Sequence, residues 1–223
     1  MRSARFFPAA LLSYGQNIVS GGDRQGANEE AIIFRREDGE RRVVTWQQLA
    51  EDSLALATFL KGAGVGPQDR VAAWMPNVPE TIVAMVATSI LGATFTSTSP
   101  DFGVAGVLDR FGQVRPTVLI AADGYVYANR RHTRLDRLAE VVAGLPSLEA
   151  VIVHGELDAQ PGLGHVREGN PGLPIVTFEQ AVEAGRRAAA GGVAIDPDAL
   201  YPFDHPLYIL YSSGTTGVPK CIV

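Results

Sequence analysis

The segment 207–223 combines an apolar strand with a cluster of hydroxyl and glycine residues. In it Tyr211 is followed by Ser212, Ser213, Gly214, Thr215, Thr216 and Gly217, and then by Val-Pro-Lys-Cys-Ile-Val. Glycines let a backbone fold tightly and point consecutive N–H groups into a concavity, while hydroxyls add further donors. Lys220, one of only two lysines in the chain, adds a compact positive charge. Without the strand and the Pro-Lys pair a plain turn would be the better interpretation. With them, the segment predicts a phosphate-binding loop.

The spacing of this loop differs from that of the Walker A loop. Two residues, Val218 and Pro219, separate Gly217 from Lys220, and Cys-Ile-Val follows where a Walker A loop opens a helix with a magnesium-binding hydroxyl. Pro219 also lacks an N–H group. We therefore expect the loop itself, and not a helix dipole, to hold the anion.

Strands and helices alternate along the rest of the chain, which predicts an α/β fold with a mainly parallel sheet and helices on both faces. Apolar, β-branched runs predict strands at 31–34, 42–45, 71–74, 117–120, 150–153 and 207–211. Capping-box patterns at 45–48 and 177–180, the pair Asn77 and Pro79, and apolar periodicity from 104 and from 135 predict helices. The stretch 155–174, in which eight residues are Gly or Pro, predicts a loop or an insertion.

Composition excludes several classes of protein. A hydrophobic content of 46% is enough for an ordinary core, and a net charge of -5 argues against nucleic acid as a partner. One cysteine and four scattered histidines predict no disulfide framework and no metal site, and they favour a reducing, cytoplasmic setting. The uncharged stretch 81–100 holds eight hydroxyl residues, which favours a buried helix and strand over a membrane span.

Several polar residues receive structural interpretations. We expect His132, His154, His165 and His205 on the surface or in turns, and Cys221 as a small packed side chain. Four arginines, Arg130, Arg131, Arg134 and Arg137, could meet the phosphates of coenzyme A, but a solvated face is the favoured interpretation. The hydroxyl-rich run 94–99 fits a site wall and a buried strand end equally well.

The loop at 211–220 resembles the signature loop of the adenylate-forming, AMP-dependent synthetases and ligases. Two weaker family motifs occur in the same order upstream, at 44–49 (Val-Thr-Trp-Gln-Gln-Leu) and at 91–102, which begins Leu-Gly-Ala. Within this family the chain is most similar to the acetoacetate-CoA ligase branch. That likeness is carried by 7–17, 99–103, 110–116 and 203–211.

The resemblance implies that residues 1–223 are part of the large N-terminal AMP-binding domain, and that the small C-terminal domain with its catalytic lysine is absent. No catalytic residue is then expected in this chain. The implied reaction adenylates acetoacetate with ATP and Mg2+ and then forms a thioester with CoA, although the chain alone is expected to be inactive. By the same likeness, residues 212–217 bind the β- and γ-phosphates and Lys220 supports them.

Three alternatives remain open at this point. The acid could be acetate or propionate, as in the similar short-chain acyl-CoA synthetases. The chain could be a non-catalytic nucleotide-binding or interaction module. Finally, it could fail to fold alone, because an open sheet edge near Val223 invites aggregation.

Overall fold

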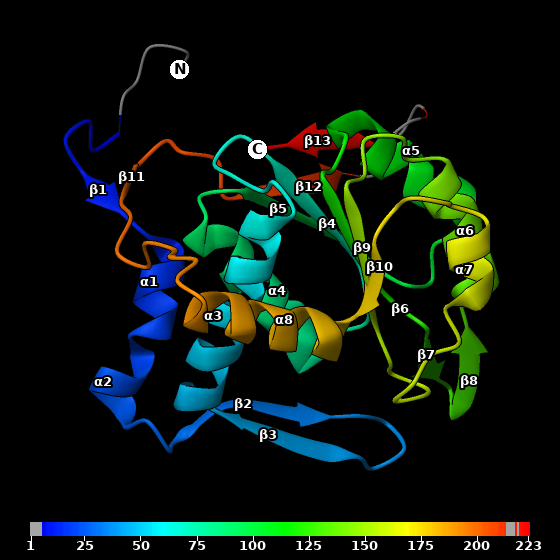
Figure 1. The fold of residues 1–223 in the computed structure, drawn as a ribbon, viewed down its shortest axis with the longest axis horizontal. Coiled ribbons are helices and arrows are strands. Elements are labelled where there is room, and N and C mark those ends of the chain that lie inside the picture. Colours follow the sequence, from blue (N-terminus) through cyan, green and yellow to red (C-terminus); the bar gives the residue numbers. More distant parts are fainter. Residues whose placement is uncertain (1–5, 213–216, 218) are drawn as a thin grey trace.

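The computed structural model describes residues 6–212, 217 and 219–223. Its centre is a seven-stranded sheet in which the first six strands are parallel and β13 is antiparallel to β12 (Figure 1). This confirms the mainly parallel sheet. In spatial order the strands are β10 (Ile175–Thr177), β9 (Ala150–His154), β6 (Val118–Ala122), β4 (Arg70–Trp74), β5 (Thr94–Thr98), β12 (Tyr208–Ser212) and β13 (Lys220–Ile222).

Helices cover both faces of the sheet, as predicted (Figure 1). Alternate residues of β4 enter different cores: Val71 and Ala73 face one, while Ala72 and Trp74 face the other. The first core lies under α3 (Trp46–Gly62), α4 (Pro79–Ile90) and α8 (Phe178–Ala190). The second lies under α5 (Val104–Val114), α6 (Leu135–Ala143) and the short α7 (Gly164–Glu168).

The two predicted capping boxes form as expected. Thr45 accepts a hydrogen bond from the Gln48 backbone at the start of α3, and Thr177 accepts one from Gln180 at the start of α8. Helix α4 begins at Pro79 with Val78 as its N-cap, so Asn77 does not cap it. The sequence 81–100 folds as most of α4 followed by β5, and no helix in the described part of the chain is long and apolar enough to cross a membrane.

Helices α3 and α8 approach each other closely at Gly185. A β-carbon on Gly185 would overlap the carbonyl oxygen of Ala55 in α3. Only a glycine therefore allows the two backbones to lie at this separation. The glycine at 185 fixes how α8 covers the sheet.

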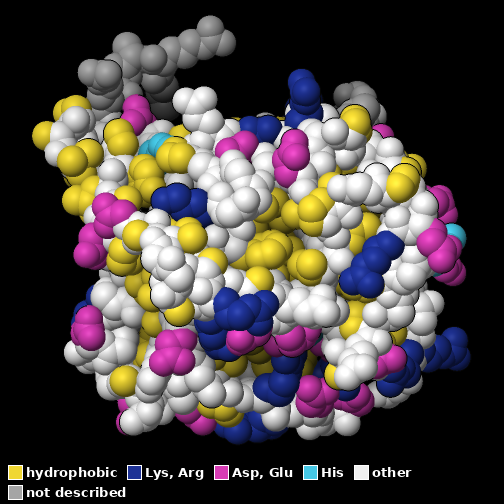
Figure 2. Space-filling model, in the orientation of Figure 1, with side chains coloured by type: hydrophobic (Ala, Val, Ile, Leu, Met, Phe, Trp, Pro, Cys, Tyr) yellow, Lys and Arg dark blue, Asp and Glu magenta, His cyan; other side chains and the backbone are white. Residues whose placement is uncertain are grey.

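Smaller elements surround the sheet. The predicted strands at 31–34 and 42–45 form a hairpin of β2 (Glu30–Arg35) and β3 (Arg41–Thr45), which turns at Asp38-Gly39. The helices α1 (Tyr14–Val19) and α2 (Gly21–Gln25) and the two-stranded pair of β1 (Leu11–Leu12) and β11 (Tyr201–Pro202) were not predicted. Exposed apolar side chains gather by that pair, at the upper left of Figure 2, and include Phe7, Leu11 and Phe203.

One prediction about the middle of the chain needs correction, and two elements there were missed. The hairpin of β7 (Gly124–Tyr127) and β8 (Arg130–Thr133), which follows the end of β6, was not predicted. The stretch 155–174 is not wholly irregular, since it contains α7, and Leu163 and Val166 from it are buried in the second core. Strand β10 directly follows this stretch and was also missed.

Candidate functional site

The predicted phosphate loop joins β12 to β13. In the antiparallel register of these strands Ser212 lies opposite Lys220, so the structure brings these two predicted site residues together at the end of the hairpin. Gly217 has φ +114°, a left-handed conformation that favours glycine. The predicted site residues Ser213, Gly214, Thr215 and Thr216 lie outside the described residues. The described part of the site is therefore the frame of the loop, meaning the paired ends of β12 and β13 at Ser212 and Lys220.

Buried contacts fix strand β12 just before the loop. The Thr96 hydroxyl of the neighbouring strand β5 donates to the carbonyl oxygen of Ile209 at 2.8 Å and lies 3.0 Å from the Tyr211 hydroxyl. Burial raises the pKa of Tyr211 to about 12, although the hydrogen bond with Thr96 opposes the shift. The phenol therefore stays neutral at physiological pH. The run 94–99 accordingly acts mainly as a buried strand, with Thr94, Thr96 and Thr98 inside.

Helix α5 packs beside this hairpin. The guanidinium of Arg110 lies 3.9 Å from the centre of the Phe102 ring and 5.9 Å from that of Tyr211. The rings of Phe111 and Tyr211 are 6.5 Å apart. Beyond the loop, Lys220 is exposed, and so is Cys221. The prediction that Cys221 is a packed side chain was wrong, because none of the described residues covers the outer edge of β13 and the thiol is exposed.

A second group of contacts holds the segment that joins β5 to α5. The indole nitrogen of Trp74 donates to the carbonyl oxygen of Ser99 at 3.2 Å, and Arg134 donates to that of Pro100 at 2.9 Å and to the Tyr125 hydroxyl at 2.7 Å. Arg134 is only 8% exposed. The prediction of a solvated face was therefore wrong for Arg134, whereas Arg130, Arg131 and Arg137 are exposed.

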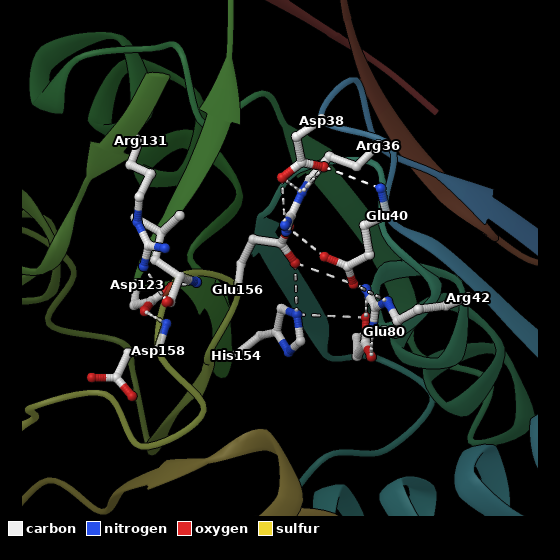
Figure 3. A network of polar contacts seen from close by, with 11 residues as sticks. Arg36, Asp38, Glu40, Arg42, Glu80, Asp123, Arg131, His154, Glu156 and Asp158 are labelled. Atoms are coloured by element: carbon white, nitrogen blue, oxygen red, sulfur yellow. Dashed lines mark hydrogen bonds and ion pairs between the residues drawn. The ribbon is translucent and has the colours of Figure 1, made fainter. Parts of the chain in front are cut away.

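Charged side chains connect the β2–β3 hairpin to the carboxyl ends of the parallel strands (Figure 3). Arg36 pairs with Glu156 at 2.6 Å, and Arg42 pairs with Glu80 at 2.7 Å. His154 lies between the two acids, with its Nε2 atom 3.3 Å from Glu156 and 3.5 Å from Glu80. The side chains of His154 and Glu156 are 5% and 4% exposed. The prediction that His154 is a surface residue was wrong, because acids distant in the sequence surround it.

A neighbouring carboxylate fixes the chain beyond β9. Both oxygens of Asp123 accept backbone hydrogen bonds at 2.9 Å, one from Leu157 and the other from Asp158 (Figure 3). Asp123 is 5% exposed. It holds the segment that carries Glu156 close to the end of β6.

The charged network gives a prediction for the pH dependence of stability. Burial alone would raise the pKa of Glu156, but His154 and Arg36 outweigh it and hold that pKa below its usual range. A lowered pKa in the folded state adds stability above the unfolded value of about 4.3, and this stability is lost as the pH falls through the folded value. We expect Glu156→Gln to cost about 3 kcal/mol at pH 7 and less at pH 3.

Urea unfolding of the chain between pH 7 and pH 3 measures this difference. The matched control is Glu149→Gln, which changes an exposed acid. A cost of Glu156→Gln that stays constant over the whole pH range would contradict the assigned role of the charge.

The described residues contain no group of three or more His, Cys, Asp or Glu side chains arranged to hold a metal ion.

The structure adds three polar residues to the neighbourhood of the loop: Thr96, Arg110 and Gln113. Spacing could not reveal them, because they meet the hairpin only when β5 and α5 pack beside it. The available signals were the hydroxyl-rich character of 94–99 and the family likeness carried by 110–116, the stretch that contains Arg110 and Gln113.

Comparisons with known proteins agree with the α/β fold described above. The family described as AMP-binding enzyme matches residues 22–223, which is most of the chain. The chain belongs to the AMP-binding enzyme family. Among solved structures, this AMP-binding chain is similar to the acetoacetyl-CoA synthetase from Streptomyces lividans, with a TM-score of 0.84 and 37% identity. That likeness covers 100% of this chain and 31% of that one.

Two curated relatives of this AMP-binding chain are informative. The acetoacetyl-coenzyme A synthetase of Rhizobium meliloti (strain 1021) is 43% identical over 100% of the chain and 32% of its own length. The malonamoyl-CoA synthetase vrtB of Penicillium aethiopicum is 37% identical over 98% of the chain and 30% of its own length. The chain thus spans about a third of the length of the relatives that it matches.

Proposed function

We propose that this chain contributes the phosphate-binding part of an acetoacetate-CoA ligase. In the proposed reaction a carboxylate oxygen of acetoacetate attacks the α-phosphorus of ATP, which forms an acyl-adenylate and releases pyrophosphate. The thiol of CoA then attacks the acyl carbon, loses its proton and releases AMP. The observation that carries the acyl assignment is the 43% identity to the R. meliloti acetoacetyl-coenzyme A synthetase over the whole chain.

The proposed task of 212–217 and Lys220 is to hold the β- and γ-phosphates. Negative charge develops on the departing pyrophosphate, so positioned N–H, O–H and ammonium donors favour the transition state. The frame supports this task, because Ser212 lies opposite Lys220 and Lys220 is exposed at the end of the hairpin. Mg2+ is proposed as a partner of ATP that arrives with this substrate. CoA and acetoacetate are the other proposed substrates.

A second acid has specific support. The 37% identity to a malonamoyl-CoA synthetase favours malonamate as an alternative. Malonamate and acetoacetate share a carbonyl group two carbons from the carboxylate and differ only by an amino group in place of a methyl group. A pocket that accepts one is therefore close in shape to a pocket that accepts the other. Discrimination between them would depend on a hydrogen bond to the amino group.

The test uses the product of the complete reading frame that contains this chain, called here the complete protein. Pyrophosphate release is measured with ATP, Mg2+, CoA and each of acetoacetate, malonamate, acetate and propionate. We expect kcat/KM for acetoacetate to exceed the values for acetate and propionate by at least about 10-fold. Preference for acetate would overturn the acyl assignment. ATP binding without pyrophosphate release from any acid would instead support a non-catalytic module.

A further inference from the structure

Helix α5 contacts the β12–β13 hairpin on both sides of the predicted loop. Before the loop, the ring of Phe111 packs against Tyr211. After the loop, the side-chain amide of Gln113 donates to the carbonyl oxygen of Pro219 at 3.0 Å. Its amide oxygen lies 3.6 Å from the thiol sulfur of Cys221. Gln113 thus touches the residue before Lys220 and the residue after it.

Gln113 reaches the strand that carries Lys220 from outside the sheet. In the described part of the chain β13 pairs with β12, and all three of its residues are exposed. A hydrogen bond from a helix side chain to the backbone at the start of such a strand adds to the restraint that the strand pairing supplies. Gln113 is well suited to that task. Its amide also donates to the carbonyl oxygen of Asp109 within α5, at 2.5 Å, which fixes the orientation of the side chain.

We propose that Gln113 is a positioning residue for ATP binding: its amide holds Pro219 and thereby sets where the ammonium group of Lys220 lies. This inference rests on the proposed phosphate-binding role of Lys220. Gln113 itself does not touch ATP in this proposal, and it acts only through the backbone of β13. Its effect should therefore be specific to ATP and should depend on the presence of Lys220.

The experiment introduces Gln113→Met into the complete protein and compares this variant with the unaltered complete protein. Methionine keeps the size and neutrality of glutamine and removes the donor. We expect the KM for ATP to rise about 10-fold, as for the loss of one hydrogen bond that positions a charge. The KM values for acetoacetate and CoA and the thermal midpoint should stay unchanged. Gln113→Asn keeps the amide but shortens the side chain by one carbon, so it should act in the same direction.

The matched control is Gln160→Met, which makes the same substitution at an exposed glutamine in the 155–174 segment. A double-mutant cycle supplies the decisive comparison. In the background of Lys220→Ala, Gln113→Met should have no further effect on the KM for ATP.

The outcomes separate the two proposals. The positioning role is overturned if Gln113→Met leaves the KM for ATP unchanged, changes all three KM values alike, or adds its full effect to that of Lys220→Ala. If Lys220→Ala alone leaves ATP kinetics unchanged, the phosphate-binding role of Lys220 fails, and the positioning role fails with it. An effect of Lys220→Ala without an effect of Gln113→Met refutes only the positioning role.

Discussion

Replacing Lys220 with alanine should lower kcat/KM for ATP in the complete protein by about 100-fold, or about 2.7 kcal/mol of transition-state stabilisation. The reason is the proposed contact between its ammonium group and the phosphates. The register of the hairpin places Lys220 opposite Ser212, at the loop. Lys220 is exposed, so the same change should leave the thermal midpoint nearly unaltered. Steady-state kinetics with varied ATP and saturating acetoacetate and CoA measure the effect.

The chain supplies its own control, because Lys61 is the only other lysine. Lys61 lies at the C-terminal end of α3, and its ammonium group donates to the carbonyl oxygen of Ala194 at 2.9 Å. Lys61→Ala should leave ATP kinetics unchanged and cost at most about 1 kcal/mol of stability. Equal losses in kcat/KM for the two lysine variants would refute a specific role for Lys220.

Replacing Gly185 with alanine should destabilise the chain by about 3 kcal/mol. The added methyl group would overlap the carbonyl oxygen of Ala55, so α8 must move away from α3 and open the first core. For a chain of this size the loss corresponds to a fall of about 6–12 °C in the thermal midpoint. Thermal and urea unfolding followed by circular dichroism measure both quantities.

Gly112→Ala is the matched control. Gly112 lies within α5 and has open space where the β-carbon would be. Alanine is the better helix former, so we expect this variant to gain about 0.5–1 kcal/mol. If Gly185→Ala were also neutral or stabilising, the close approach of α3 and α8 described above would be wrong.

The sheet and its helices could be predicted because their signals are local. Apolar, β-branched runs marked the main strands, and Thr45 and Thr177 marked the helix starts that the structure has. Strand β10 escaped because it has only three residues, begins directly after Pro174 and ends at Thr177, which also caps α8. The β7–β8 hairpin escaped because its second strand, Arg-Arg-His-Thr, lacks apolar alternation.

The site could be predicted only where one segment carries all of it. The hydroxyls, glycines and lysine of 212–220 form a contiguous pattern, so the sequence alone identified a candidate loop. Contacts made by packing have no such pattern. His154 is buried because Glu80 and Glu156 reach it from other elements, and Arg134 is buried because the segment after β5 accepts its hydrogen bond. The spacing of residues along the sequence could not reveal these partners of His154 and Arg134.

The ion pair between Arg36 and Glu156 has a consequence for the order of events during synthesis. The two residues are 120 positions apart. At 5–20 residues per second, a ribosome that has just made Arg36 needs roughly 6–24 s more to make Glu156. The ion pair of Arg42 with Glu80 can form earlier, but the contact of Arg36 with Glu156 has to wait for that interval. The arginines and acids of the β2–β3 hairpin keep it hydrated meanwhile, which protects the nascent chain from pairing with its neighbours.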